Sequence, residues 1–177
     1  MSAPASEKVH EPQVPFADAI DRLVRKIGHV VCWANAALIV VIMTQIVLDS
    51  FGAGRVALDE LQWHLYAFAV MMGTSYAQVT SSQIRVDVIA SRLSLRTMRR
   101  WEVFGIVAFA LPFVAVVFIH SLDFLAESWR LGERSDAPLG LPWRWVIKSV
   151  IPLSFALLGF ALVSRLIREL AGLLRKD

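Results

Sequence analysis

Four long runs of apolar residues constrain this chain more than any other feature. They cover roughly residues 28–48, 61–79, 103–122 and 146–164. A bilayer core about 30 Å thick requires about 20 apolar residues of α-helix, and each run has that length. The mean hydropathy of +0.58 and the 19% of charged residues are typical of a membrane protein. The sequence therefore predicts an all-α membrane protein with four transmembrane helices.

The runs differ in their polar content. The second carries no formal charge but several polar side chains, so we expect neighbouring helices to shield it from lipid. Pro112 lies inside the third run and predicts a kink, because proline lacks the N–H that bonds to the carbonyl one turn earlier. Lys148 and Pro152 lie near the start of the fourth, where the lysine can extend its ammonium to the headgroups.

The basic residues predict the orientation in the membrane. Thirteen of the eighteen lie before the first run, between the second and third, or after the fourth. Cytoplasmic loops are enriched in Lys and Arg, so both termini are predicted to be cytoplasmic. Residues 1–27 then form a cytoplasmic segment, 28–170 the four-helix membrane domain and 171–177 a cytoplasmic tail. Because topology explains these charges, we expect a lipid bilayer and no nucleic acid as partner.

The loop between the second and third runs shows helical periodicity. Val86, Ile89 and Leu93 recur about one turn apart, while Arg85 and Arg92 lie on other faces. This pattern predicts a short amphipathic helix in the plane of the headgroups.

Two helix boundaries are also predicted. Ser94 is a candidate N-cap for a helix that continues into the third span. The apolar periodicity of residues 165–174 predicts that the fourth helix extends beyond its apolar run.

The chain offers few residues for chemistry. A self-contained proton-coupled exporter places an ionisable residue deep in a helix, whereas Glu60 and Asp123 lie near the ends of their runs. Cys32 is the only cysteine, which excludes an intrachain disulfide and a thiolate metal site. We expect no enzyme activity, no catalytic or metal site and no cofactor. One alternative stays open: His64 and His120, near the outer ends of two runs, as haem ligands in the membrane subunit of a respiratory enzyme.

Two surfaces are candidates for contact with a partner. Ala69, Gly73 and Ala77 are spaced four apart and form a stripe of small side chains, which allows another helix backbone to approach closely. The outer loop, ESWRLGERSDAPLGLPWRW, has mixed charges that suit contact with a soluble protein, and Glu133 and Asp136 are its candidate contacts. A solvated connector is equally consistent with these residues.

Three segments resemble a known family. They are DELQWHLYAFAVMMGTSYAQ at the second run, IRVDVIASRLS after it, and GLPWRWVIKSVIPLSFALLGFAL at the fourth. Their order resembles the small membrane subunit of tripartite ATP-independent periplasmic (TRAP) transporters, the DctQ-like small permease. The residues that carry the family motif, with structural roles implied, are Glu60, Arg85, Asp87, Pro142 and Pro152.

The resemblance implies a non-catalytic partner protein in the bacterial inner membrane. In such systems a periplasmic binding protein captures an organic acid, and a large membrane subunit moves it inward with a sodium gradient. The small subunit braces the large one, which carries the substrate and sodium sites. Arg85 and Asp87 are then expected to fix the inner turn or to contact the large subunit.

Overall fold

The structure, a computed structural model, describes residues 15–82 and 93–174. Within these ranges the chain forms helices and connecting loops and contains no β-strand, which confirms the predicted all-α class. The elements are α1 (Pro15–Ser50), α2 (Val56–Thr80), α4 (Leu95–Gly105), the π-helical segment η1 (Ile106–Ala110), α5 (Leu111–Arg130) and α6 (Arg144–Leu174).

Three helical stretches are long and apolar enough to cross a membrane. They are Pro15–Ser50, Leu95–Arg130 and Arg144–Leu174 among the described residues. The 25-residue α2 is not one of these three. Its length of about 37 Å, at 1.5 Å per residue, nevertheless exceeds a bilayer core.

The helices extend beyond the predicted apolar runs. α1 begins at Pro15, well before residue 28, and α6 continues to Leu174 as predicted. The cap at Ser94 is confirmed, since its side chain accepts a hydrogen bond from the Thr97 N–H at 3.3 Å. Most of the predicted amphipathic helix of the inner loop, including Val86 and Ile89, lies outside the described residues.

The third span departs from regular α-helix next to Pro112. The Leu111 N–H bonds to the Ile106 carbonyl, the i to i−5 pattern of η1. Pro112 has no N–H, and its ring would clash with the carbonyl four residues earlier. The local widening to a π-helix just before the proline is consistent with that clash, at the place where the sequence predicts a kink.

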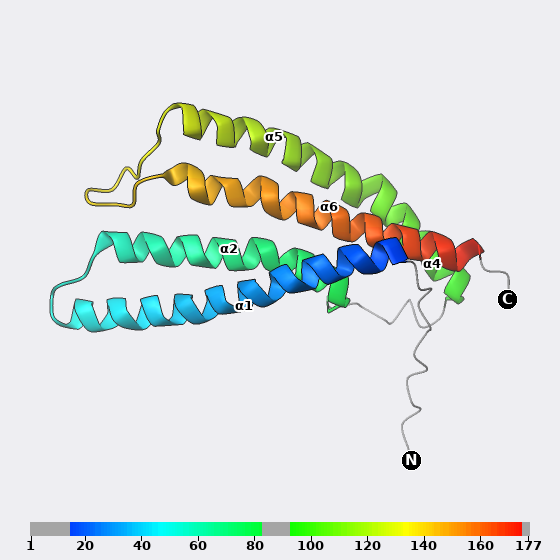
Figure 1. Cartoon of the computed structure of the whole chain (residues 1–177), viewed down its shortest axis with the longest axis horizontal. Coiled ribbons are helices and arrows are strands. Elements are labelled where there is room, and N and C mark those ends of the chain that lie inside the picture. The colour runs from blue at the N-terminus through cyan, green and yellow to red at the C-terminus, as the bar shows by residue number, and fades with distance from the viewer. Residues whose placement is uncertain (1–14, 83–92, 175–177) are drawn as a thin grey trace, which may run out of the picture.

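The helices form an open layer (Figure 1). α2 lies between α1 and α6, and α6 lies between α2 and α5, so α1 and α5 occupy the two edges. The first turns of α1 cross onto the last turns of α6. A closed four-helix bundle would surround a common core, whereas this layer leaves broad helix faces without protein cover.

Two small clusters of buried side chains join the layer. The larger unites α1, α2 and α6, and the smaller unites η1, α5 and α6. Their buried members are Val31, Ala69, Met72, Val150 and Leu157 in the first, and Ile106, Val114 and Leu162 in the second. α6 contributes to both clusters and is therefore the central helix of the layer.

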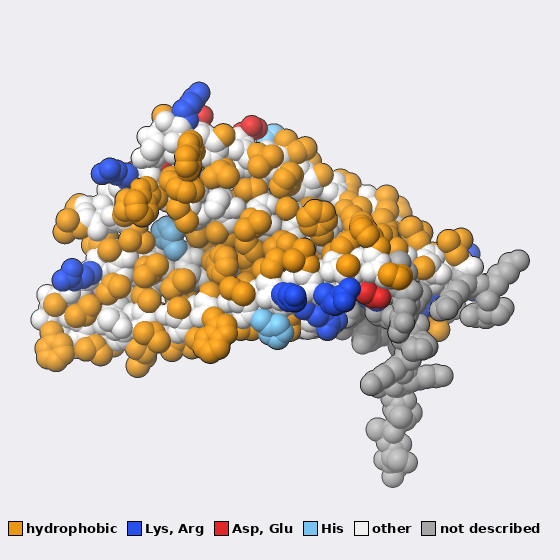
Figure 2. All heavy atoms as spheres, in the orientation of Figure 1, with side chains coloured by type: hydrophobic (Ala, Val, Ile, Leu, Met, Phe, Trp, Pro, Cys, Tyr) orange, Lys and Arg blue, Asp and Glu red, His pale blue; other side chains and the backbone are white. Residues whose placement is uncertain are grey.

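The surface of the layer is mainly apolar. Figure 2 shows hydrophobic side chains over the length of the helices on one face, with Lys and Arg toward the two ends. Trp33 on α1 and Phe109 in η1, just before α5, expose 77% and 68% of their surface. Such an area would be unfavourable in water and is expected to be covered by lipid or by another membrane protein.

Candidate functional site

The outer loop, residues 131–143, is fastened to the start of α2 by Glu60. One Glu60 carboxylate oxygen accepts the Ser135 hydroxyl, and the other accepts the Leu141 N–H at 2.6 Å. Gly140 fits beside this contact because a Cβ there would lie 2.8 Å from Glu60 Oε1 and still closer to Ser135. The arrangement, the Glu60 clamp, joins residues about 75 positions apart in the sequence.

A second set of contacts holds the loop to α6. The Lys148 ammonium contacts the Glu133 carboxylate and lies 3.9 Å from the centre of the Phe124 ring. Arg144 reaches Asp136 at 3.1 Å and Glu133 at 3.9 Å. Lys148 on α6 therefore forms an ion pair with Glu133, and this contact holds the loop to α6.

Glu60 on α2 and Glu133 in the loop are both held in their ionised form. Hydrogen bonds from Ser135 and Leu141 lower the pKa of Glu60, which precedes the apolar run, and the hydrogen bond from Lys148 lowers the pKa of Glu133. An unfolded carboxyl group binds protons more readily than these two do. Their stabilising effect is thus complete above the ordinary carboxyl pKa and is lost as the pH falls through the lowered values.

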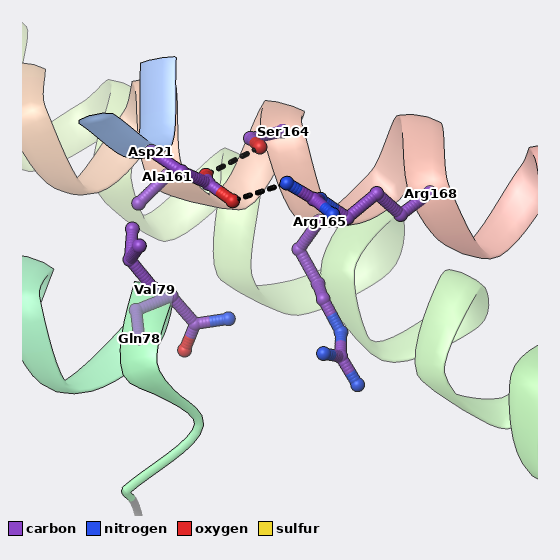
Figure 3. Close-up of a pocket in the computed structure, with 7 residues that line it drawn as sticks. All are labelled: Asp21, Gln78, Val79, Ala161, Ser164, Arg165 and Arg168. Carbon is purple, nitrogen blue, oxygen red and sulfur yellow. Dashed lines mark hydrogen bonds and ion pairs between the residues drawn. The ribbon is translucent and has the colours of Figure 1, made fainter. Parts of the chain in front are cut away.

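At the end of the layer opposite this loop, α1 and α6 are joined by an ion-pair cluster, here called the inner cluster (Figure 3). Arg168 Nη2 lies 2.5 Å from Asp21 Oδ2 and 2.7 Å from Asp18 Oδ1. The Ser164 hydroxyl, which is buried, lies 2.7 Å from Asp21 Oδ1 and 3.2 Å from the Ala17 carbonyl oxygen. Asp21, Ser164 and Arg168, together with Gln78 and others, line a polar pocket of about 20 Å³, with room for about one water.

The inner cluster continues onto α4. Arg165 Nη2 lies 2.9 Å from Glu169, and Arg165 Nε lies 3.5 Å from Glu102. Arg99 Nε lies 3.8 Å from the same glutamate, Glu169. Ion pairs thus join α6 to the first turns of α1 and to α4, so the basic residues in this region contribute to the packing of the helices.

Only part of the small-residue stripe of α2 packs against other helices of this chain. Ala69 is buried in the cluster that joins α1, α2 and α6. A Cβ added at Gly73 would meet no atom of the described chain within 4 Å. Gly28 on α1, in contrast, lies directly against α2, since a Cβ there would lie 2.1 Å from the Tyr76 ring. Gly73 is therefore open to a neighbour from another molecule.

The two candidate haem ligands lie on different helices of the layer. His64 is on α2 and His120 on α5, with α6 between these helices (Figure 1). His64 Nδ1 lies 2.5 Å from the Glu60 carbonyl oxygen. Its ring lines an apolar pocket of about 380 Å³, and the other lining residues supply no second imidazole. This arrangement does not favour the haem hypothesis.

The remaining family-motif residues have different outcomes. Pro142 lies exposed two residues before α6, and Pro152 is buried inside that helix. Arg85 and Asp87 lie outside the described residues. Sequence reasoning missed Ser135, the partner of Glu60, and it missed the inner cluster of Asp18, Asp21, Ser164 and Arg168. The sequence did contain a signal for this cluster. Asp18 and Asp21 are spaced three residues apart, as are Arg165 and Arg168, so each pair can lie on one face of its helix.

The chain was compared with known proteins. The family model described as "Tripartite ATP-independent periplasmic transporters, DctQ component" matches residues 38–172. That range begins within α1 and extends almost to the end of α6. No curated protein and no solved structure matches the chain.

Proposed function

The chain belongs to the DctQ component family of tripartite ATP-independent periplasmic transporters, and from this membership we propose that it braces the large membrane subunit of a sodium-coupled importer. The substrate is an organic acid delivered by a periplasmic binding protein, and the complex lies in the bacterial inner membrane. The observation that carries the proposal is the family match, together with an open layer whose apolar helix faces lack protein cover. The scaffold has no catalytic or cofactor role.

The proposal includes a topology of four crossings with both termini in the cytoplasm. Its support is the distribution of basic residues and the course of α2, which lies between α1 and α6 and runs antiparallel to α1 and parallel to α6. α2 is the most polar of the four, and its neighbours shield it on two sides. The boundaries of the membrane domain at residues 28–170 remain part of this proposal.

Cysteine labelling tests the topology. In a Cys32→Ser background, Asp136→Cys is expected to react with a membrane-impermeant maleimide in intact cells, because the outer loop faces the periplasm. Leu174→Cys, at the exposed end of α6, should react only after the membrane is opened. Labelling of Leu174→Cys in intact cells would overturn the four-crossing arrangement.

The proposed contact with the large subunit is the part of the small-residue stripe at Gly73 and Ala77, with Arg85 and Asp87 at the inner turn. Ala69, the third residue of the stripe, is buried within the chain. Gly73→Leu is expected to reduce copurification with the large subunit at least severalfold, because a close helix approach requires the missing side chain. The fold of the chain itself should persist, since the space at Gly73 is open.

Gly105→Leu is the matched control, because a Cβ there also meets no atom of the described chain but lies off the stripe. Pull-down of the tagged large subunit after expression of both subunits measures the effect. Equal recovery of the Gly73→Leu and Gly105→Leu variants would refute the stripe as the contact.

The outer loop is the proposed docking surface for the binding protein, with Glu133 and Asp136 as its charged residues. The Asp136 side chain is 96% exposed, whereas Glu133 is occupied by Lys148. Asp136→Lys is expected to lower uptake severalfold at unchanged subunit abundance, through reversed charge at the contact. Charges of this kind act most strongly at low ionic strength. If the Asp136→Lys variant took up the substrate as fast as the wild type under that condition, this role would be contradicted.

A further inference from the structure

The tip of the outer loop presents an apolar side chain in an unusual backbone conformation. Leu139 is 92% exposed and has a φ of 65°, in the left-handed region. Leucine rarely adopts this conformation, whereas asparagine and glycine adopt it readily. Neither the backbone nor solvation favours leucine at this position, so its benefit has to come from something that the side chain contacts.

The loop around Leu139 is held by hydrogen bonds on both sides. The Gly140 N–H bonds to the Ala137 carbonyl at 3.0 Å, and the Ala137 N–H bonds to Ser135 Oγ at 3.2 Å. Ser135 and Leu141 are in turn fixed by the Glu60 clamp. Leu139 is thus presented in a defined position, which reduces the entropy lost when a partner binds it.

The charges near the tip indicate which kind of partner covers it. Asp136, three residues away, exposes 96% of its side chain and pairs with Arg144. Arg134 is also exposed. Placing these charges in the hydrocarbon would be strongly unfavourable, so the tip lies in water. The surface that covers Leu139 therefore belongs to an extramembrane protein domain.

We propose that Leu139 is the apolar anchor by which the outer loop holds the periplasmic binding protein, which offers it a shallow apolar cup. The inference rests on the proposed function and adds the residue and the chemistry of the contact. A few side chains that lie near the centre of an interface and are fully desolvated there commonly supply most of its affinity. The polar rim then consists of Arg134 and Asp136.

The test uses the complex of both membrane subunits in nanodiscs and the purified binding protein of the same transporter. Leu139→Asn is expected to weaken binding roughly 10- to 100-fold, the range that corresponds to burial of one leucine side chain. The thermal midpoint of the complex should stay equal or rise, because asparagine suits the left-handed conformation. Leu139→Met should largely retain the affinity.

Leu131→Asn is the matched control, because Leu131 is another exposed leucine of the loop but has an ordinary φ of −81°. Equal affinities for the Leu139→Asn and Leu131→Asn complexes would overturn the proposal. Loss of the large subunit from the Leu139→Asn complex would also overturn it, by assigning the contact to that subunit. Failure of the wild-type chain to assemble with the large subunit would show that the proposed function itself is wrong.

Discussion

Replacing Arg168 by alanine is expected to separate the inner ends of α1 and α6 and to lower the free energy of unfolding by about 2–3 kcal/mol. The change removes the cation that lies within 2.7 Å of both Asp18 and Asp21. Two neighbouring carboxylates would then repel each other. This loss of unfolding free energy is smaller than the loss expected for a fully buried ion pair, because Arg168 and Asp21 keep 14% and 15% of their side-chain surface exposed.

The midpoint of thermal unfolding of the purified subunit measures this effect. Arg22→Ala is the control. Arg22 is exposed, and within the described part of the chain its side chain bonds to the Asp18 carbonyl oxygen and not to a carboxylate. Arg168→Lys should fall between the two, because lysine keeps the charge but lacks the guanidinium group whose Nη2 contacts both carboxylates. Equal midpoints for Arg168→Ala and Arg22→Ala would contradict a stabilising role for the inner cluster.

Replacing Glu60 by alanine is expected to release the outer loop and to abolish most uptake. The change removes the acceptor of both the Ser135 hydroxyl and the Leu141 N–H. Amide hydrogen exchange at Leu141 should accelerate roughly tenfold or more, because a bond to a carboxylate is among the stronger hydrogen bonds. Uptake falls because the loop no longer presents a defined surface to the binding protein.

Asp59→Ala serves as the control for Glu60, since Asp59 is a neighbouring carboxylate on α2 that is exposed. Glu60→Gln should be intermediate, because the amide keeps one acceptor oxygen and loses the charge. Gly140→Ala tests the clamp from its other side, by placing a methyl group against Ser135 and Glu60. Unchanged exchange at Leu141 in Glu60→Ala would show that the clamp does not hold the loop.

The all-helical class and the approximate positions of the helices were predictable because they depend on local properties. An apolar run of bilayer length must form a helix to satisfy its backbone hydrogen bonds. The Ser94 cap and the departure from regular helix near Pro112 follow from residues within one or two turns. The open layer, in contrast, depends on which faces pack together, and similar small and apolar residues occur on several faces.

The candidate site was predictable only in part. Glu60 was identified through the family motif, but its partner Ser135 lies 75 residues away. The stripe predicted a close helix approach, whereas Gly73 meets no atom of the described chain within 4 Å and Gly28, outside the stripe, lies against Tyr76. The pattern identifies small residues but not the partner that fills the space beside them, because lipid and helix neighbours favour the same residues.

On the proposed function, this chain supports transport without transporting anything itself. Proteoliposomes with an inward sodium gradient test it most directly, with uptake of the organic acid that the binding protein captures as the readout. Uptake is expected only when both membrane subunits and the binding protein are present. Liposomes that contain this chain alone should take up no more organic acid than empty liposomes. Saturable uptake by liposomes that contain this chain alone would contradict the scaffold function.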